Sequence, residues 1–225
     1  MDVCGSSSFH LPHIMLVGLE NAGKTFFLYS RLKTIITPGN DSVRTKPTDS
    51  FNYEEVEIGA FNVAVWDLPG RANLRIFWPN FYRTIEFSGL IYFIDYDNKD
   101  VLPESVRVMH DLLSEEELED VKILIILNKS RVAKKKTFKT NNLTDDDGKD
   151  GKESKGSKEK ETSGKDEEEN EMNKIREEIK KTIYFDLIKQ KAKDIYYFDL
   201  YESTTNENDM QKTQTQMKKF ISSFD

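Results

Sequence analysis

The stretch Gly18-Leu19-Glu20-Asn21-Ala22-Gly23-Lys24-Thr25 matches the pattern Gly, four residues, Gly, Lys, then Ser or Thr. In this pattern the loop's backbone N–H groups surround the phosphates of a nucleotide, the lysine contacts the β- and γ-phosphates, and the hydroxyl ligates Mg²⁺. The apolar run at 13–17 predicts a strand before the loop, and Thr25 to Leu32 predicts a helix whose N-terminal end faces the anion. The stretch therefore predicts a phosphate loop in an α/β protein that binds a nucleoside triphosphate with Mg²⁺.

The chain's composition excludes several classes of protein. Its 225 residues, 37% of them hydrophobic, allow one domain or a small pair with a real core. A net charge of -7 and a pI near 5.2 argue against nucleic acid as a partner. The longest apolar runs, 90–94 and 123–127, are far shorter than the ~20 residues of a membrane span, and residues 1–12 do not resemble a signal peptide. The single cysteine, Cys4, cannot form an internal disulfide, which favours a cytoplasmic protein. Cys4 is either an ordinary free thiol or a site of acylation.

A threonine downstream of the loop is a candidate metal ligand. Residues 34–46 are rich in Thr, Pro, Gly, Asn and Asp, and form a connection too long to be a simple turn. They lead to Thr48, which could reach a metal bound near Thr25. A surface threonine in a turn is an equal alternative.

An aspartate and a glycine complete the candidate site. Residues 53–58 and 61–66 alternate apolar and polar positions around Gly59-Ala60, which predicts a hairpin. Asp67 follows the second strand at the carboxyl edge, where open α/β sheets bind ligands, and suits a hold on Mg²⁺ through a water molecule. Gly70 can offer a backbone N–H to a γ-phosphate.

These motifs resemble the ADP-ribosylation factor (Arf) and Arf-like branch of the small GTPases. The tryptophan before Asp67 and the Phe51-Asn52 pair are more typical of that branch than of Ras-like proteins. The resemblance is carried by Gly18 to Thr25, Pro47-Thr48, Phe51-Asn52, Tyr53 to Asp67, Gly89 to Asp95, Leu113 to Leu118 and Ile123 to Lys129. It implies a guanine nucleotide and Mg²⁺ as cofactors, and effector, exchange-factor and GTPase-activating proteins as partners. It also implies a part in vesicle trafficking.

The later segments agree with this fold class. The continuous apolar runs 90–95 and 123–128 predict parallel strands covered on both faces, and 104–113 between them has helical spacing. Asn128 and Lys129 lie at the end of the second of these strands, where the resemblance implies that guanine is recognised.

The guanine motif departs from the family pattern Asn-Lys-x-Asp, because Arg131 stands where the acid belongs. A carboxylate accepts two hydrogen bonds from guanine, whereas a guanidinium only donates. The loss of two contacts of ~1.5 to 3 kcal/mol each weakens guanine binding by at least a hundredfold. Tyr201 to Thr204 also fits poorly to the family's second base-contacting loop. Guanine selectivity is therefore in question.

A second departure concerns hydrolysis, because Arg71 stands where the family has the glutamine that orients the attacking water. Arg71 cannot accept a hydrogen bond from that water, so hydrolysis should be very slow. The alternative is that Arg71 stabilises transition-state charge as an arginine finger does. Pro69 biases Leu68 towards extended geometry and restricts the second switch. Arg71 and Thr48 are the candidate catalytic residues.

The termini and one insertion complete the domain plan. Asp2 replaces the glycine that N-myristoylation requires, so a lipidated helix is not expected, although peripheral association with internal membranes stays open. Residues 1–12 are expected to be flexible, and 13–225 to form one monomeric GTPase domain. The segment 134–173, nearly free of apolar residues, predicts a disordered insertion in that domain. A docking role for the insertion is the alternative to a tolerated surface loop.

The remaining elements predict a six-stranded, mostly parallel sheet with helices on both faces. They are a helix with apolar residues at 172, 175, 179 and 183, a strand at 195–200, and a final helix whose apolar stripe runs from Met210 to Phe224. Two functions remain open. One is an Arf-like nucleotide switch with impaired hydrolysis, and the other is a nucleotide-insensitive GTPase relative that serves as an interaction scaffold.

Overall fold

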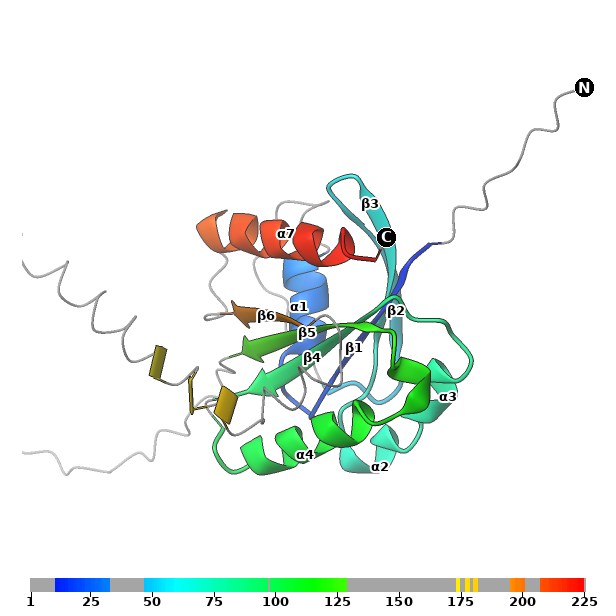
Figure 1. The fold of residues 1–225 in the computed structure, drawn as a ribbon, viewed down its shortest axis with the longest axis vertical. Coiled ribbons are helices and arrows are strands. Elements are labelled where there is room, and N and C mark those ends of the chain that lie inside the picture. Colours follow the sequence, from blue (N-terminus) through cyan, green and yellow to red (C-terminus); the bar gives the residue numbers. More distant parts are fainter. Residues whose placement is uncertain are drawn as a thin grey trace, which may run out of the picture. The chain divides into compact units, whose positions relative to one another are not determined.

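Figure 1 shows the computed structural model of the chain, which describes residues 11–32, 47–96, 98–128, 173–174, 177–178, 180–181, 195–200 and 207–224. The chain divides into two compact units, Met1–Arg131 with Ile183–Asp225, and Val132–Thr182. In the second unit the described residues are helical, and Lys180 donates to Glu177 at 2.9 Å. Within the predicted insertion at 134–173, only Asn173 is described, and it is helical. Residues 134–172 lie outside the described residues, as do residues 1–10 of the predicted flexible N-terminus and the apolar positions of the helix predicted near 172–183.

The first unit alternates strands and helices along the chain. Its elements are β1 (His13–Gly18), α1 (Lys24–Phe27), the π-helical turn η1 (Leu28–Leu32), β2 (Asn52–Ile58), β3 (Phe61–Asp67), α2 (Ala72–Arg75), α3 (Trp78–Tyr82), β4 (Gly89–Asp95), α4 (Leu102–Leu112), the 3₁₀ turn η3 (Glu116–Leu118), β5 (Lys122–Asn128), β6 (Ile195–Leu200) and α7 (Glu207–Ile221). No helix among these described elements is long and apolar enough to cross a membrane.

The strands form one six-stranded sheet in the order β2-β3-β1-β4-β5-β6. β2 runs antiparallel to β3, and the other neighbouring strands are parallel. The predicted fold class is therefore confirmed. Because the parallel strands share a direction, the residues at their carboxyl ends gather at one edge of the sheet, where this architecture binds ligands.

The predicted hairpin is present, and its register matters for the site. Gly59 adopts a left-handed φ of 70° in the two-residue turn, so Ile58 pairs with Phe61 and, six residues further along, Asn52 pairs with Asp67. The second strand was predicted to end at Trp66, but it includes Asp67, which is completely buried.

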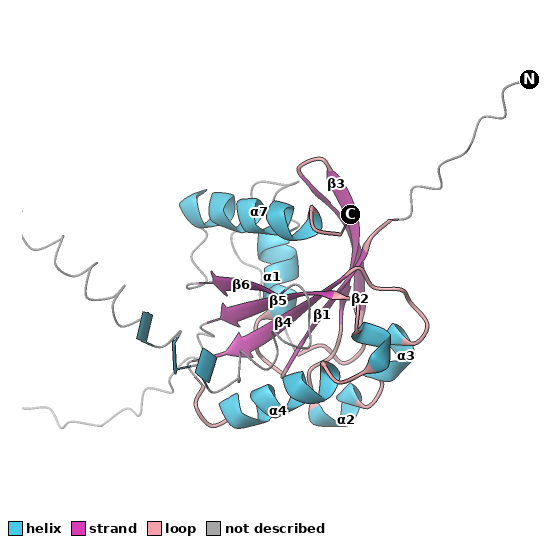
Figure 2. Cartoon of the chain, in the orientation of Figure 1, coloured by secondary structure: helices cyan, strands magenta, loops and turns pink. Residues whose placement is uncertain are grey.

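Helices cover both faces of the sheet, as predicted. Figures 1 and 2 show α1 and α7 on one face and α2, α3 and α4 on the other. β4 is buried along its whole length because alternate side chains face the two layers. Phe93 packs beside Phe27 of α1, whereas the hydroxyl of Tyr92 donates to the carbonyl of Ser105 in α4 at 2.8 Å.

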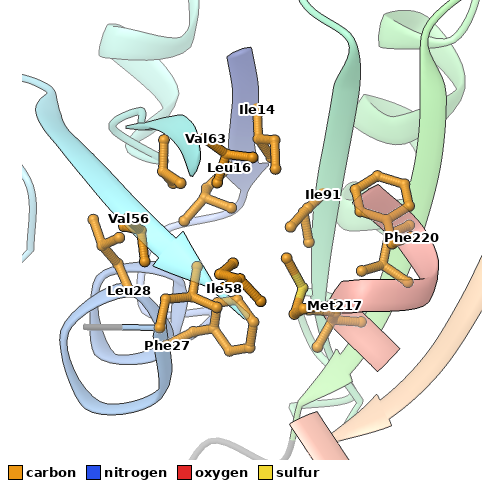
Figure 3. Packing of buried hydrophobic residues seen from close by; sticks show 14 of the residues in the cluster. Ile14, Leu16, Phe27, Leu28, Val56, Ile58, Val63, Ile91, Met217 and Phe220 are labelled. Carbon is orange, nitrogen blue, oxygen red and sulfur yellow. The ribbon is translucent and has the colours of Figure 1, made fainter. Parts of the chain in front are cut away.

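The α7 face holds the main apolar cluster. Figure 3 shows side chains of the hairpin, α1 and η1 meeting Met217 and Phe220 of α7. The hairpin residues Val56 and Ile58 are nearly or fully buried in it. The turn end of the hairpin is therefore fixed by core packing on this side.

Several predicted boundaries were wrong by one or more residues. The first helix begins at Lys24 and becomes a π-helical turn at Leu28, and the helix predicted at 104–113 spans Leu102–Leu112. The final helix ends at Ile221, although Phe224 beyond it still packs against the core. Periodicity places the apolar positions correctly but does not define where the hydrogen-bond pattern of a helix starts or changes.

Candidate functional site

The phosphate loop connects β1 to α1, and its lysine is folded onto the loop itself. Lys24 Nζ donates to the carbonyls of Gly18 and Leu19 at 3.1 and 2.8 Å, and the side chain is buried. Burial lowers the pKa of Lys24 to about 8, although the negative charges of Asp67 and Glu20 oppose this shift. The loop therefore holds a desolvated amine at the place where the sequence predicts phosphate contact.

The second glycine of the phosphate loop, Gly23, lies too close to Asn128 of β5 to carry a side chain. Gly23 has a left-handed φ of 95°, and a Cβ atom there would lie 2.2 Å from the Nδ2 atom of Asn128. The amide of Asn128 donates instead to the carbonyl of Ala22 at 2.9 Å. The predicted base-contacting residue Asn128 is thus joined directly to the phosphate loop.

The predicted metal ligands meet in one polar cluster, which we call the inner cluster: Thr25, Thr48, Asp67 and Asn52. The hydroxyl of Thr25 donates to Asp67 Oδ2 at 2.6 Å and lies 2.9 Å from the hydroxyl of Thr48. The two hydroxyls are therefore within hydrogen-bond distance of each other, and Thr25 also reaches the carboxylate. The amide of Asn52 donates to the same Oδ2 atom at 2.9 Å. Thr48 therefore belongs to the site and is not a turn residue remote from it.

Burial is the largest influence on the pKa of Asp67. It raises the pKa of the carboxyl, while the hydrogen bonds from Thr25 and Asn52 and the charge of Lys24 act in the opposite direction. Its Oδ1 atom is buried and has no hydrogen-bond partner among the described residues. This free acceptor suits a water molecule bound to a metal ion.

The inner cluster fits Mg²⁺ in its donor chemistry and in its spacing. Adjacent ligands in an octahedral Mg²⁺ shell with bonds of 2.0–2.1 Å lie about 2.9 Å apart. The hydroxyl oxygens of Thr25 and Thr48 have that separation. Thr25 and Thr48 would supply two such ligands, and Asp67 would act through a water molecule.

The segment after Asp67 packs closely on the phosphate loop and is hydrogen-bonded to α2 and α3. A Cβ atom on Gly70 would lie 2.5 Å or less from the carbonyl groups of Gly18 and Leu19, so only glycine fits there. The indole of Trp78 donates to the carbonyl of Pro69 at 2.9 Å, and Arg75 Nη1 donates to that of Gly70 at 3.0 Å. This segment therefore has a defined path beside the loop.

Comparison with known proteins now identifies the family. The model of the ADP-ribosylation factor family matches residues 6–147, more than half of the chain. The chain belongs to the ADP-ribosylation factor family. A curated relative, ADP-ribosylation factor-like protein 1 of Saccharomyces cerevisiae, is 35% identical over 116 residues, which are 52% of this chain and 59% of that protein.

The fold of this Arf-family chain also resembles a solved structure. It is similar to the Arl6 BBS3 small GTPase from Trypanosoma brucei with bound nucleotide analogue GppNp, with a TM-score of 0.61 and 14% sequence identity. The alignment covers 96% of this chain and 100% of that one. Family membership confirms the predicted resemblance and identifies Gly18 to Thr25 as the phosphate loop of an Arf-like small GTPase, a family that binds guanine nucleotides.

An aromatic surface lies next to the inner cluster of this Arf-family protein. We define it by Phe51, Tyr53, Trp66 and Phe81, whose rings pack in tilted or edge contacts with centroids between 4.8 and 6.1 Å apart. Phe51 and Tyr53 are 45% and 41% exposed. Exposed large aromatic side chains in one patch are typical of a protein-binding surface.

Sequence reasoning missed two features of the Arf-family site. Asn52 was not predicted to bind Asp67, although counting back along both strands from the two-residue turn pairs the two positions. The contacts of Arg71 with Glu20 and Asp49 had no signal in the sequence, because they join separate loops. The predicted base-contacting residues Lys129 and Arg131 lie outside the described residues.

Proposed function

We propose that this chain is an Arf-like nucleotide switch that binds a nucleoside triphosphate together with Mg²⁺. The observation that carries the proposal is the 2.9 Å separation of the Thr25 and Thr48 hydroxyls above a buried carboxylate, beside the phosphate-loop lysine. A bound Mg²⁺ would neutralise charge on the β- and γ-phosphates. Thr48 and Gly70 come from the two switch segments, so a triphosphate that contacts both would order both.

The proposed output of the switch is protein binding through the aromatic surface. Phe51 and Tyr53 follow Thr48 by three and five residues, and Trp66 directly precedes Asp67, so we expect ordering of the metal ligands to affect these aromatic side chains. Effector, exchange-factor and GTPase-activating proteins are the expected partners, and the protein itself is expected to be a monomer. A cytoplasmic role in vesicle trafficking, with peripheral attachment to internal membranes, is the setting that this function suggests.

Slow hydrolysis is the second part of the proposal. Arg71 occupies the position of the family's water-orienting glutamine, and its guanidinium donates to Glu20 and Asp49. It offers no acceptor to a water molecule. This orientation also supports the interpretation of Arg71 as a structural cation over that of an arginine finger.

Base selectivity is the third part. Asn128 is placed beside the phosphate loop, which suits purine contact, whereas Arg131 replaces the acid that accepts two hydrogen bonds from guanine. We expect weakened preference for guanine over xanthine and adenine.

A nucleotide-insensitive scaffold is the second candidate. The ion pairs of Arg71 with Glu20 and Asp49 favour it, because they join the two switch segments to the phosphate loop through protein charges alone. Such a protein would present the aromatic surface whether or not a nucleotide is bound.

Calorimetry on the full chain distinguishes the two candidates. Guanine, adenine and xanthine triphosphates are titrated with Mg²⁺ and again with EDTA. The switch predicts binding that requires Mg²⁺, with the three bases ranked in competition. If no triphosphate binds with Mg²⁺, the switch is rejected and the scaffold is retained.

A further inference from the structure

Arg71 joins three segments that are distant in the sequence. Its Nε and Nη2 atoms donate to Glu20 Oε1 at 3.2 and 3.0 Å, and its Nη1 atom donates to Asp49 Oδ1 at 2.9 Å. Glu20 belongs to the phosphate loop, and Asp49 is the residue after Thr48. We call these three residues the arginine clasp.

The clasp is exposed, in contrast with the inner cluster, in which Asp67 is buried and the other three residues are partly buried. The side chains of Arg71, Glu20 and Asp49 are 43%, 34% and 78% exposed. Exposed ion pairs add little to global stability. The rigid fork of a guanidinium is nevertheless well suited to hold two carboxylates in defined positions. The hydrogen bond with Glu20, and then the charges of Glu20 and Asp49, raise the pKa of Arg71, which therefore stays a cation.

The clasp holds the residue next to Thr48. Thr48 is hydrogen-bonded to Thr25 on its inner side, toward the inner cluster, and the side chain of its neighbour Asp49 is bonded to Arg71 in contact with solvent, which we call the outer side. The base of the clasp is itself constrained, because Gly70, next to Arg71, packs directly on the loop's backbone. A displacement of Thr48 from Thr25 therefore requires the Asp49 contact to break or the second segment to move.

We propose that Arg71 is a positioning residue that keeps Thr48 in the metal site by tying Asp49 to Glu20. The inference rests on the proposed function, since it concerns the Mg²⁺ dependence of nucleotide binding. The tie consists of protein charges, and it acts on Thr48 in the state in which a triphosphate and Mg²⁺ order that residue. The position occupied in the family by a hydrolytic glutamine would thus serve here to retain metal and nucleotide.

The test measures release of a fluorescent, non-hydrolysable guanine triphosphate analogue across a range of Mg²⁺ concentrations and again in EDTA. Arg71→Ala and Asp49→Ala should raise the Mg²⁺ concentration needed for slow release by about three- to tenfold. In EDTA the variants should release nucleotide at the wild-type rate, because the clasp acts only through a metal ligand. A purely structural defect would accelerate release in both conditions.

A charge reversal and a charge-preserving variant make the test specific. Asp49→Arg places a like charge beside Arg71 and should raise the Mg²⁺ requirement, whereas Asp49→Glu keeps the opposite charge and should leave the requirement close to that of the wild type. Arg83→Ala is the matched control, because Arg83 is also an exposed arginine between two acids, Glu115 and Glu117, at 3.6 and 2.8 Å. It should leave the Mg²⁺ dependence unchanged.

The outcomes separate this inference from the proposed function. If the wild-type protein binds no nucleotide with Mg²⁺, the proposed function fails. If the wild type binds but Arg71→Ala keeps the wild-type Mg²⁺ dependence, or Asp49→Glu raises the Mg²⁺ requirement as much as Asp49→Arg does, the clasp is rejected and the switch remains.

Discussion

Thr48 is held from two sides by groups of different chemistry. On its inner side, Thr48 is hydrogen-bonded to Thr25, whose hydroxyl donates a short, partly buried hydrogen bond to the buried carboxylate of Asp67. These oxygen groups are the ligand types that Mg²⁺ prefers. On its outer side, next to it in sequence, Asp49 meets the guanidinium of Arg71 in contact with solvent. Metal binding and water activation thus depend on different residues in different environments, so a chain can keep the first and lose the second.

The difference in burial between the inner cluster and the arginine clasp predicts which substitutions change nucleotide binding most. Charges in the inner cluster are poorly screened, and burial raises the pKa of Asp67. The clasp is exposed to solvent and salt, so its contribution is small and adjustable. Substitutions on the inner side should therefore have greater effects on binding than substitutions on the outer side.

The largest effect is expected from Lys24→Ala. It removes the buried ammonium group that lies at the phosphate position, and with it the hydrogen bonds to Gly18 and Leu19. Triphosphate affinity should fall by at least about a hundredfold in a fluorescence titration. Lys219→Ala, on the exposed side of α7, is the control and should bind normally. Equal affinity in Lys24→Ala would mean that the phosphates bind elsewhere.

Asp67→Asn should weaken function and strengthen the fold. The Mg²⁺ requirement for nucleotide binding should rise by about ten- to a hundredfold, because the carboxylate that suits a metal-bound water is lost. The pKa of Asp67 is higher in the folded protein than in the unfolded chain, so protonation of Asp67 adds to the free energy of unfolding at low pH. That contribution is lost as the pH rises through the folded-state pKa, and at neutral pH the protein bears the cost of burying the ionised carboxylate. The neutral amide should therefore raise the Tm by a few degrees in metal-free buffer. A lower Tm would show that the charge is well compensated.

Asn52→Ala tests the support of that carboxylate. It removes one hydrogen bond to Asp67 while leaving the two hydroxyls in place. The Mg²⁺ requirement should rise by about three- to tenfold. Asn62→Ala, an exposed position in β3, is the matched control. An Asn52→Ala protein with wild-type Mg²⁺ dependence would remove Asn52 from the site.

The smallest effect on nucleotide release is expected from an increase in salt concentration. Raising the ionic strength should screen the clasp and accelerate nucleotide release by about two- to fivefold at limiting Mg²⁺. The same change should have less effect on Arg71→Ala, which has no clasp to screen. An identical salt response in both proteins would show that other charges dominate.

The fold was predictable from the sequence because its signals are local. Continuous apolar runs defined β4 and β5, and Gly59-Ala60 fixed the hairpin. Asp67 and Asn128 could be assigned to the site because both end strands whose carboxyl ends meet at one edge. The two-residue turn also fixes the pairing of Asn52 with Asp67, but this consequence of the hairpin register was not used to predict the site.

The contacts of Arg71 could not be predicted, because they depend on how loops are placed in space. Glu20, Asp49 and Arg71 belong to three connections, and nothing in their sequence spacing brings them together. The sequence showed only that the water-orienting glutamine is absent. The structure shows that Arg71 bonds Glu20 and Asp49. This contact is the basis of our proposal that residue 71 helps to retain Mg²⁺ and nucleotide, whereas the family's glutamine at this position serves hydrolysis.

The central claim is that the inner cluster supports nucleotide binding while Arg71 prevents efficient hydrolysis. Single-turnover release of γ-phosphate, measured at saturating Mg²⁺ on wild type and Arg71→Gln loaded with the same triphosphate, tests it most directly. We predict that the wild type is close to the uncatalysed rate and that Arg71→Gln is at least about tenfold faster. A wild-type rate equal to or above that of Arg71→Gln would contradict the account.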